Sequence, residues 1–276
     1  MKSKAESVLA GKRIRVHVLG CRSNLYEAEA ISSALSQKGA VTCEGGAFDG
    51  AIVVSCVVTA EAERKCRQLV RRLKREEPAA PVVVCGCWAQ LLDEKKARDM
   101  GINALVGNRR KHRVAAVVEK LLEEHVSPVL LTDRVDVSAN LSWDGLLLES
   151  PKFHVRAFVK VQDGCDNRCA YCIVTVARGP SHSRLPKQVL ADVRQRLEEG
   201  AQEVILSGVN IGAYGRDRPG QGPLPSAEGW SLARLVRRIL EDTHVPRLRL
   251  SSIEPWDLDA DLVSLWPHPR LCRQLH

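Results

Sequence analysis

The sequence predicts an α/β protein in which parallel strands alternate with helices, and three observations support this fold class. Short apolar runs of strand length recur along the 276-residue chain. A stretch with helical periodicity follows most of these runs, and each connection is long enough for a parallel crossover. The series occurs twice, with a segment between its two occurrences in which the periodicity is lost. We therefore expect two βα domains, at residues 12–125 and 151–276, joined by a linker at 126–150.

The first domain is predicted to be a parallel sheet covered by helices. Its expected strands are Ile14 to Leu19, Ala51 to Ser55, Val82 to Cys85 and Ala104 to Val106. Its expected helices are Leu25 to Lys38, Thr59 to Glu76, Gln90 to Met100 and Lys111 to Glu124. In the linker, an extended run from Val129 to Thr132 could add an edge strand.

The second domain is predicted to contain three further βα repeats. Its expected elements are strand Val155 to Val161, a helix that opens at Pro186, strand Glu203 to Ser207, helix Ser231 to Glu241, strand Arg247 to Ser251 and a short helix around Leu258 to Leu265. A fourth strand could begin in Leu271 to His276. A complete (β/α) barrel needs about 250 residues. We therefore expect this domain to be the first part of a barrel that the chain leaves incomplete.

Three cysteines with C-x3-C-x2-C spacing form the most informative motif. Cys165, Cys169 and Cys172 stand in the run Gly-Cys-Asp-Asn-Arg-Cys-Ala-Tyr-Cys, directly after a predicted strand. Three thiolates on one loop can hold three irons of a cubane 4Fe–4S cluster, and no fourth cysteine follows within the loop. The remaining iron would then be open to a substrate. The alternative is a zinc knuckle with His182 as fourth ligand, since zinc also accepts three cysteines and a histidine.

A second set of cysteines follows the strands of the first domain. Cys21, Cys56 and Cys87 each come just after an apolar run. In a parallel sheet the loops at the carboxyl ends of the strands converge on one crevice, so these three thiols could hold a second cluster with an open iron. The alternative is that they are ordinary buried thiols. Four other cysteines lack this placement and are expected to be core residues or to have no assigned role: Cys43, Cys66, Cys85 and Cys272.

Composition limits the partners and the compartment. The 41 Lys and Arg residues outnumber the 33 Asp and Glu residues, and the net charge of +8 favours a polyanion partner. The densest basic run, Arg64 to Arg75, could contact RNA or could simply solvate one helix face. No apolar run approaches the roughly 20 residues of a membrane span, and Met1 to Lys12 is polar and charged. We therefore expect a cytoplasmic protein without membrane contact, whose ten cysteines are metal ligands or buried thiols rather than disulfides.

The two cysteine sets, together with Gly-Cys-Arg-Ser-Asn-Leu-Tyr-Glu and Ser-Gly-Val-Asn-Ile-Gly-Ala-Tyr-Gly, resemble the radical S-adenosylmethionine (SAM) methylthiotransferases over nearly the whole chain. Within that family, residues 177–184, 208–215 and 248–255 are similar to the bacterial enzymes that modify N6-threonylcarbamoyladenosine in tRNA. Thr175 and Val176 depart from the Pro-Tyr expected before Ala-Arg-Gly. The resemblance implies a methylthiotransferase N-terminal domain, followed by an incomplete radical SAM partial barrel that lacks its second half and the RNA-binding β-barrel module.

The resemblance also implies cofactors, partners and roles. The cluster on the catalytic cysteines Cys165, Cys169 and Cys172 would bind SAM and cleave it reductively. The cluster on the first-domain cysteines would supply sulfur for a methylthio group on adenine C2 at tRNA position 37. The implied partners are tRNA and an electron donor such as flavodoxin or ferredoxin. The residues implied near SAM are Tyr171, Arg178, Gly208, Asn210 and Glu254.

Some of these roles, and the function itself, have alternatives. Arg178 could bind RNA phosphate or be solvated, Glu254 could form a structural salt bridge, and the loop at Gly208 could be an ordinary flexible connection. A sibling enzyme would act on isopentenyladenosine in tRNA or on a ribosomal-protein aspartate. An inactive iron–sulfur or zinc-binding fragment belongs to a different class, and the expected incompleteness of the barrel keeps it open.

Overall fold

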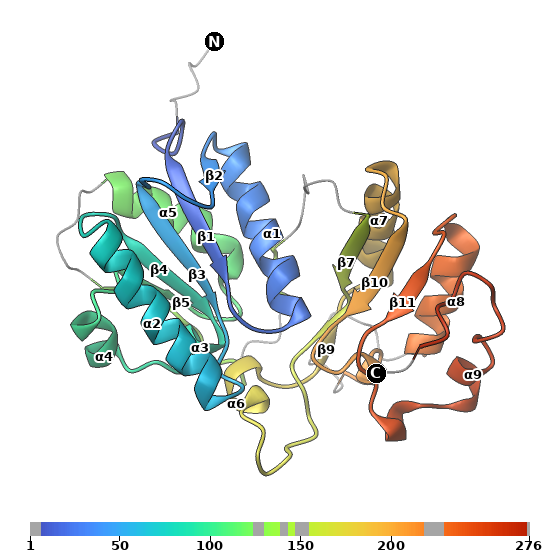
Figure 1. Cartoon of the computed structure of the whole chain (residues 1–276). Helices are drawn as coiled ribbons and strands as arrows, with labels where there is room; N and C mark the ends of the chain where they lie inside the picture. The colour runs from blue at the N-terminus through green and yellow to red at the C-terminus, as the bar shows by residue number, and fades with distance from the viewer. Residues whose placement is uncertain (1–6, 124–129, 139–142, 147–154, 218–228, 275–276) are drawn as a thin grey trace. The chain divides into compact units, whose positions relative to one another are not determined.

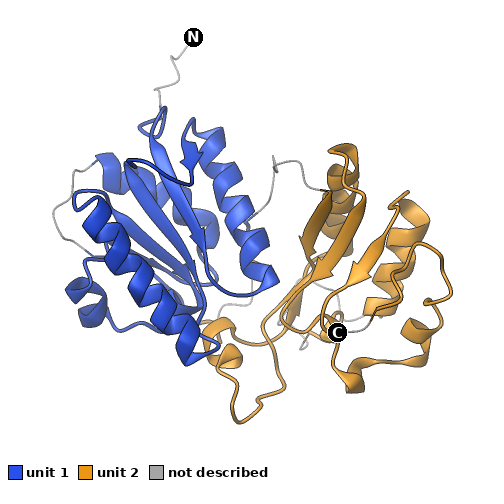
Figure 2. Cartoon of the chain, viewed as in Figure 1, with its two compact units in different colours: residues 1–136, 144–151 blue, residues 137–143, 152–276 orange. Residues whose placement is uncertain are grey.

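The structure is a computed structural model that describes residues 7–123, 130–138, 143–146, 155–217 and 229–274. The chain divides into two compact units (Figure 2). Unit 1 comprises residues 1–136 and 144–151, and unit 2 comprises residues 137–143 and 152–276. Several stretches of the predicted linker, namely 126–129, 139–142 and 147–150, lie outside the described residues.

Unit 1 is built on a six-stranded sheet with the order β2-β1-β3-β4-β5-β6 (Figure 1). Its strands are β1 (Arg13–Val18), β2 (Val41–Cys43), β3 (Gly50–Ser55), β4 (Val82–Gly86), β5 (Ala104–Val106) and β6 (Leu131–Asp133). Every pair of neighbouring strands is parallel. The expected α/β class is confirmed, β6 forms the edge strand anticipated in the linker, and β2 was not predicted.

The helices of unit 1 follow the strands as expected, with one helix divided. They are α1 (Arg22–Gln37), α2 (Ala60–Glu76), α3 (Cys87–Leu91), α4 (Glu94–Asp99), the 3-10 turn η1 (Lys111–Arg113) and α5 (Val114–Glu123). The single helix predicted from Gln90 to Met100 is wrong. Asp93 is extended and its side chain accepts a hydrogen bond from the N–H of Lys96, so a new helix starts there.

Helix α2 shows how the sequence of unit 1 specifies an element. The hydroxyl of Thr59 accepts a hydrogen bond from the N–H of Ala62 and caps the first turn. Cys66, Val70 and Leu73 form the buried face, which packs into a core with the apolar residues of β3 and β4. Burial raises the pKa of Cys66 to about 11, as expected of a structural thiol.

Unit 2 contains a three-stranded parallel sheet in the order β11-β10-β7 and a separate two-stranded antiparallel ladder. The strands are β7 (Arg156–Lys160), β8 (Gln162–Asp163), β9 (His182–Ser183), β10 (Glu203–Ser207) and β11 (Leu248–Leu250). The predicted strands of this unit correspond to β7, β10 and β11. The β8–β9 ladder was not predicted, because each of its strands is only two residues long.

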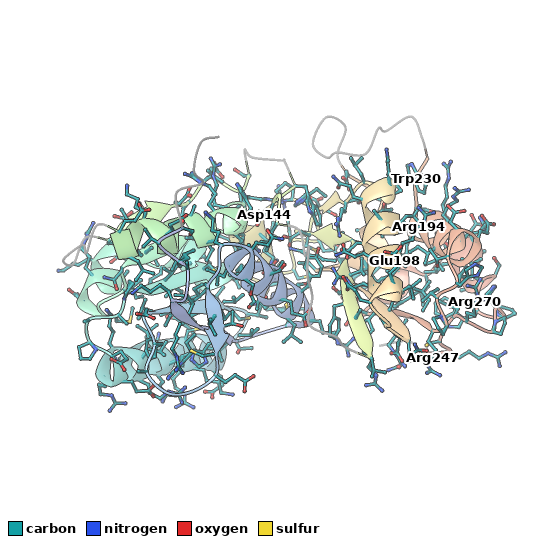
Figure 3. The ribbon with its side chains drawn as sticks, turned by 90° about the horizontal axis from the view of Figure 1, so that it is seen from above. Asp144, Arg194, Glu198, Trp230, Arg247 and Arg270 are labelled. Carbon is teal, nitrogen blue, oxygen red and sulfur yellow. The ribbon has the colours of Figure 1, made fainter. Side chains whose placement is uncertain are left out.

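The helices of unit 2 are α6 (Val174–Arg178), α7 (Pro186–Glu198), η2 (Ile211–Ala213), α8 (Leu232–Asp242), η4 (Pro255–Asp257) and α9 (Ala260–Val263). Pro186 opens α7 as predicted. Where a fourth strand was expected, Leu271 forms one parallel bridge to Leu248. The guanidinium of Arg270, labelled in Figure 3, donates to the carbonyl oxygens of Leu240 and Thr243 (2.8 Å to the latter) and so caps the end of α8. No helix in the described part of the chain is long and apolar enough to cross a membrane.

Candidate functional site

Three cysteines of unit 1 lie at the carboxyl ends of three neighbouring strands. Cys21 precedes α1 after β1, Cys56 directly follows β3, and Cys87 follows β4 as the first residue of α3. Because β1, β3 and β4 are parallel and adjacent, their carboxyl ends lie along the same edge of the sheet. Cys21 is exposed, whereas Cys56 and Cys87 are buried.

Gly20 allows the turn before Cys21 to approach Cys56 closely. Its φ is 129°, and a Cβ atom at this position would lie 2.6 Å from the Cβ and 3.1 Å from the Sγ of Cys56. Any side chain here would therefore push the two segments apart.

Asn24 ties the ends of β1 and β3 together from the first turn of α1. Its side-chain Nδ2 donates to the carbonyl oxygens of Leu19 (3.0 Å) and Ser55 (3.1 Å). Its Oδ1 lies 3.4 Å from the Sγ of Cys21, which donates to it. One buried amide thus fixes the backbone that leads into Cys21 and the backbone that leads into Cys56.

A buried ion pair stands behind Cys87. The Nζ of Lys111 donates to Glu27 Oε1 at 2.5 Å and to Asn108 Oδ1 at 3.2 Å. The side chains of Lys111 and Glu27 are 0% and 1% exposed. The Sγ of Cys87 is 3.9 Å from the same Asn108 oxygen. The Cys87 thiol, the Asn108 amide and the Lys111 ammonium group therefore form one hydrogen-bonded network near the carboxyl end of β4.

Asp144, labelled in Figure 3, anchors the segment that carries Lys111. Its carboxylate accepts hydrogen bonds from the backbone N–H groups of Lys111 (3.2 Å) and His112 (3.1 Å), and it pairs with His112 Nδ1 at 2.8 Å. These bonds satisfy amide donors at the start of η1. The position of Lys111 is therefore set from a part of the chain more than 30 residues away.

The cysteines of unit 2 lie in the loop between β8 and α6, and all three are partly exposed. Arg168 has a φ of 47°, a left-handed conformation that is uncommon for residues with a side chain, and it turns the chain before Cys169. The N–H of Cys172 then donates to the carbonyl of Cys169 at 2.9 Å. Burial raises the pKa of Cys165, and negative charge on Cys172 and Cys169 raises it further. The three thiols are therefore close enough to influence one another.

Tyr171 and Glu254 lie near this loop. Tyr171 is 91% exposed. Negative charge on Cys169 raises the pKa of Tyr171, and the Glu254 carboxylate contributes in the same direction. Glu254 is exposed and follows β11. The carboxyl end of β11 is thus within electrostatic range of the cysteine loop.

Asp163 anchors both ends of the cysteine loop. Its carboxylate accepts hydrogen bonds from Lys160 Nζ (2.8 Å), Arg178 (2.9 Å) and the N–H of Gly164 (2.9 Å). The side chain of Arg178 is only 2% exposed, so the expectation that it could be solvated is wrong. Its role toward SAM or phosphate stays a prediction, while the ion pair with Asp163 gives it a structural role.

Gln162 connects the cysteine loop to the end of β10. Its Oε1 accepts hydrogen bonds from the N–H groups of Val209 (3.0 Å) and Asn210 (2.8 Å). Its Nε2 donates to the carbonyl of Gly164 (2.7 Å) and to Ser181 Oγ (2.9 Å). Both ends of this buried amide are therefore in use, and the turn after β10 is held in register with the start of the loop.

The turn after β10 has properties expected of a ligand site. A Cβ at Gly208 would lie 2.8 Å from the carbonyl oxygen of Gln162, so the backbone approaches closely there. Within the described part of the chain, the buried Ser207 Oγ and Asn210 Oδ1 have no hydrogen-bond partner. Buried polar atoms are normally satisfied. The two unpaired polar atoms are therefore free to accept or donate hydrogen bonds to a ligand.

The zinc alternative for this loop requires His182 as the fourth ligand. His182 is buried, and its ring lies edge-on against Trp143 with centroids 5.4 Å apart. Among the residues that the structure describes, no three His, Cys, Asp or Glu side chains surround a point where one metal ion could bind. A zinc knuckle needs such a point. A cubane cluster places each cysteine on a different iron, so it does not require the thiols to meet at one ion.

Several positioning residues were not assigned from the sequence. Asn24 and Glu27 belong to the motif Gly-Cys-Arg-Ser-Asn-Leu-Tyr-Glu. This motif marked the segment in the sequence, but it did not indicate what these two side chains bind. Gln162 and Asp163 directly precede the cysteine loop, but their partners lie up to 48 residues away. Lys111 has a partner 84 residues away.

Comparison with known proteins links the two units to one family. The model of "Uncharacterized protein family UPF0004" matches residues 13–107. A threonylcarbamoyladenosine tRNA methylthiotransferase of Thermotoga maritima is 30% identical over 269 residues, 96% of this chain and 57% of the relative. Its counterpart in Chlamydia pneumoniae is 33% identical over 247 residues, 88% of this chain and 52% of the relative. A tRNA-2-methylthio-N(6)-dimethylallyladenosine synthase of a Parafrankia species is 28% identical, over 97% of this chain and 53% of the relative.

The chain spans slightly more than half the length of these curated relatives. A solved structure with a similar fold is the radical S-adenosylmethionine methyltransferase TsrM from Kitasatospora setae, with tryptophan and a SAM analogue bound. It matches with a TM-score of 0.60 and 13% identity, over 95% of this chain and 58% of that protein. The fold and the similarity along nearly the whole chain agree: the chain is similar to the named methylthiotransferases, and its fold resembles that of a radical SAM enzyme.

Proposed function

We propose that the protein is a tRNA methylthiotransferase that modifies adenine C2 of N6-threonylcarbamoyladenosine, with two 4Fe–4S clusters and SAM as cofactors. The observation that carries this proposal is the placement of one cysteine trio after the carboxyl ends of parallel strands in unit 1 and of another in the loop after β7 and β8 in unit 2. The names of the relatives from Thermotoga maritima and Chlamydia pneumoniae support the substrate.

In this proposal the residues of each unit have separate tasks. Cys165, Cys169 and Cys172 hold one cluster, and Cys21, Cys56 and Cys87 hold the other. When bound, the clusters and SAM supply the redox and sulfur chemistry, while the protein orients them and excludes water.

The remaining residues position the ligands. Gln162 holds the turn at Gly208 and Asn210 against the cysteine loop, and Asn210 Oδ1 is available to a donor group of SAM. Tyr171 and Glu254 lie within electrostatic range of each other, and Tyr171 is also in range of Cys169 in the cysteine loop. We further propose that an electron donor such as flavodoxin or ferredoxin serves the enzyme in the cytoplasm.

A second candidate is supported by the relative from Parafrankia, whose name specifies dimethylallyladenosine. The two substrates differ in the group on adenine N6, whereas the chemistry at C2 is the same. The cysteine sets therefore do not distinguish the two candidates, and a direct measurement of the nucleoside is needed.

The deciding experiment is mass spectrometry of tRNA nucleosides from a strain that lacks the gene. We expect the methylthio derivative of threonylcarbamoyladenosine to disappear, to return with the wild-type gene or a Cys272→Ala variant, and to stay absent with Cys165→Ala or Cys56→Ala. Cys272 is a suitable control because it is a partly exposed thiol outside both trios. Loss of the isopentenyl derivative instead would establish the second candidate, and no change in either nucleoside would refute both.

A further inference from the structure

Helix α2 carries two sets of basic residues that differ in their partners. In its first half, Arg64 and Lys65 both pair with Glu61 (2.7 and 3.7 Å), and Arg67 pairs with Glu63. These three cations are paired with two carboxylates of the same helix, as in many solvated faces. The arginine-rich run predicted from the sequence is therefore not uniform.

In the second half of α2, two arginines are unpaired. Arg71 and Arg75 are exposed, and within the described part of the chain neither has a carboxylate at ion-pair distance. Arg72 lies between them and is 3.4 Å from Glu76, a carboxylate that also pairs with Arg15. The positive charge of this half of the helix is therefore only partly compensated by the protein.

The unpaired arginines line a hollow of about 780 Å³ on the surface of unit 1. We call it the α2 hollow; it is formed by Gln68, Arg71, Arg72, Lys74 and Arg75 of α2 and by Asp99 and Met100 at the end of α4. Gln68, Arg71, Arg72 and Arg75 are spaced i, i+3, i+4 and i+7 and so share one face of the helix. Four cations and one carboxylate therefore face a single concave surface.

Lys74 forms a fixed wall of the hollow. Its ammonium group donates to the carbonyl of Ala80 at 2.9 Å. A Cβ at Gly101 would lie 3.5 to 3.7 Å from three atoms of the Lys74 stem, so this stem packs over the glycine. Arg71 and Arg75 therefore lie beside the ammonium group of Lys74, which is already held in place. Several cations on one surface attract a ligand that carries several negative charges more strongly than a single small anion.

We propose that the α2 hollow binds the phosphate backbone of RNA, an inference that rests on the proposed action on tRNA. Guanidinium groups bind phosphate through paired hydrogen bonds. Arg71 and Arg75 are one helical turn apart, at an axial separation of about 6 Å, so they can engage neighbouring phosphates. None of the described residues that line the hollow is aromatic, so none can stack on bases, and the hollow would position the RNA without reading its sequence.

The α2 hollow is separate from the cysteine trio of unit 1, Cys21, Cys56 and Cys87. Helix α2 begins after Cys56, and Arg71 to Arg75 lie 11 to 15 residues beyond Ala60, which corresponds to roughly 17 to 22 Å along the axis. Substitutions there should therefore leave iron loading unchanged. These substitutions therefore test RNA binding separately from cluster assembly.

The test compares two double variants of the same helix in the full chain. Arg71→Gln/Arg75→Gln removes the unpaired charges, and Arg64→Gln/Lys65→Gln removes the same number of paired charges. Binding of an unmodified tRNA transcript is measured by fluorescence anisotropy between about 50 and 200 mM salt. Iron content and far-ultraviolet circular dichroism confirm that both variants are loaded and folded.

We expect Arg71→Gln/Arg75→Gln to weaken tRNA binding on the order of tenfold and to lower the slope of log K against log salt by about 1.4 to 1.8, as expected for two lost phosphate contacts. The control should change affinity less than about twofold. Equal effects of the two variants, or none, would overturn the proposal. So would unchanged tRNA binding together with lost binding of an acidic electron-transfer protein.

The same measurements separate this inference from the proposed function. If the wild-type protein binds tRNA through the hollow but the gene deletion leaves the methylthio nucleosides unchanged, the proposed function fails and the RNA surface stands. If the nucleoside disappears on deletion but the double variant binds tRNA like the wild type, the surface is wrong and the function stands.

Discussion

The buried pair between Lys111 and Glu27 offers a sharp test of how unit 1 is stabilised. Replacing Lys111 by Met keeps an unbranched side chain that is only one atom shorter, but leaves the Glu27 carboxylate, 1% exposed, without its cation. Removing one partner of a buried ion pair typically costs about 3 to 5 kcal/mol. With a urea dependence of about 2 kcal/mol per molar, the unfolding midpoint of unit 1 should fall by roughly 1.5 to 2.5 M.

Two thiols make it possible to follow unit 1 separately from unit 2. Cys66 and Cys85 are both 0% exposed and both lie in unit 1. A brief alkylation pulse at each urea concentration, followed by mass spectrometry of the peptides that contain these cysteines, reports the unfolding of this unit alone. Burial also raises the pKa of both thiols, which keeps them unreactive in the folded state.

Two further variants decide the interpretation. Lys38→Met removes a cation that pairs with Glu119 at 2.6 Å, but these side chains are 39% and 18% exposed, so the loss should be about 1 kcal/mol or less. Glu27→Gln/Lys111→Met removes both buried charges and should recover most of the stability lost in the single variant. If Lys111→Met costs no more than Lys38→Met, the buried pair is not the stabilising element that we describe.

Three other predictions follow from local geometry. Gly208→Ala places a Cβ 2.8 Å from a backbone oxygen and should destabilise unit 2 by about 1 to 3 kcal/mol, whereas Gly45→Ala, with nothing within 4 Å, should change stability by less than about 0.5 kcal/mol in urea unfolding. Gln162→Leu removes the acceptor of two amides in the turn after β10, so their hydrogen exchange should accelerate at least about tenfold, and unchanged exchange would contradict the assigned bonds. Burial, and then the charge of Arg72, lowers the pKa of His17 below 6.5 in the folded state. The unfolded chain therefore binds more protons than the folded one, so the free energy of unfolding should fall as the pH drops below about 6.5. His17→Gln should make this free energy depend less on pH, as measured by urea unfolding with the alkylation pulse described above.

The sequence was sufficient for features that depend on local pattern. The run Ala51 to Ser55 is almost wholly apolar, and it forms the fully buried strand β3 with Cys56 at its carboxyl end. Because a parallel sheet aligns the ends of its strands, the gathering of Cys21, Cys56 and Cys87 at one edge could be anticipated from the order of strands and cysteines alone.

The sequence was insufficient where a local cap interrupts an apolar pattern and where the decisive partner lies elsewhere in the chain. The break between α3 and α4 depends on capping by Asp93, which the apolar periodicity of Gln90 to Met100 conceals. Arg178, at the end of α6, is buried and pairs with Asp163 of β8, on the other side of the cysteine loop. A charged residue beside a cysteine loop looks solvated in the sequence, and only the folded chain shows that its charge is paired inside.

Both cysteine sites use a buried side-chain amide to hold their backbone. In unit 1, Asn24 joins the ends of β1 and β3, and in unit 2, Gln162 joins the cysteine loop to the turn after β10. An amide suits this task because it offers donors and an acceptor and carries no net charge. Its hydrogen bonds to the backbone therefore persist whether the nearby thiols are protonated, ionised or bound to iron, whereas the bond that Cys21 Sγ donates to Asn24 Oδ1 exists only with the protonated thiol. A carboxylate or an ammonium group at the same place would instead couple the geometry of the backbone to the charge of the nearby thiols.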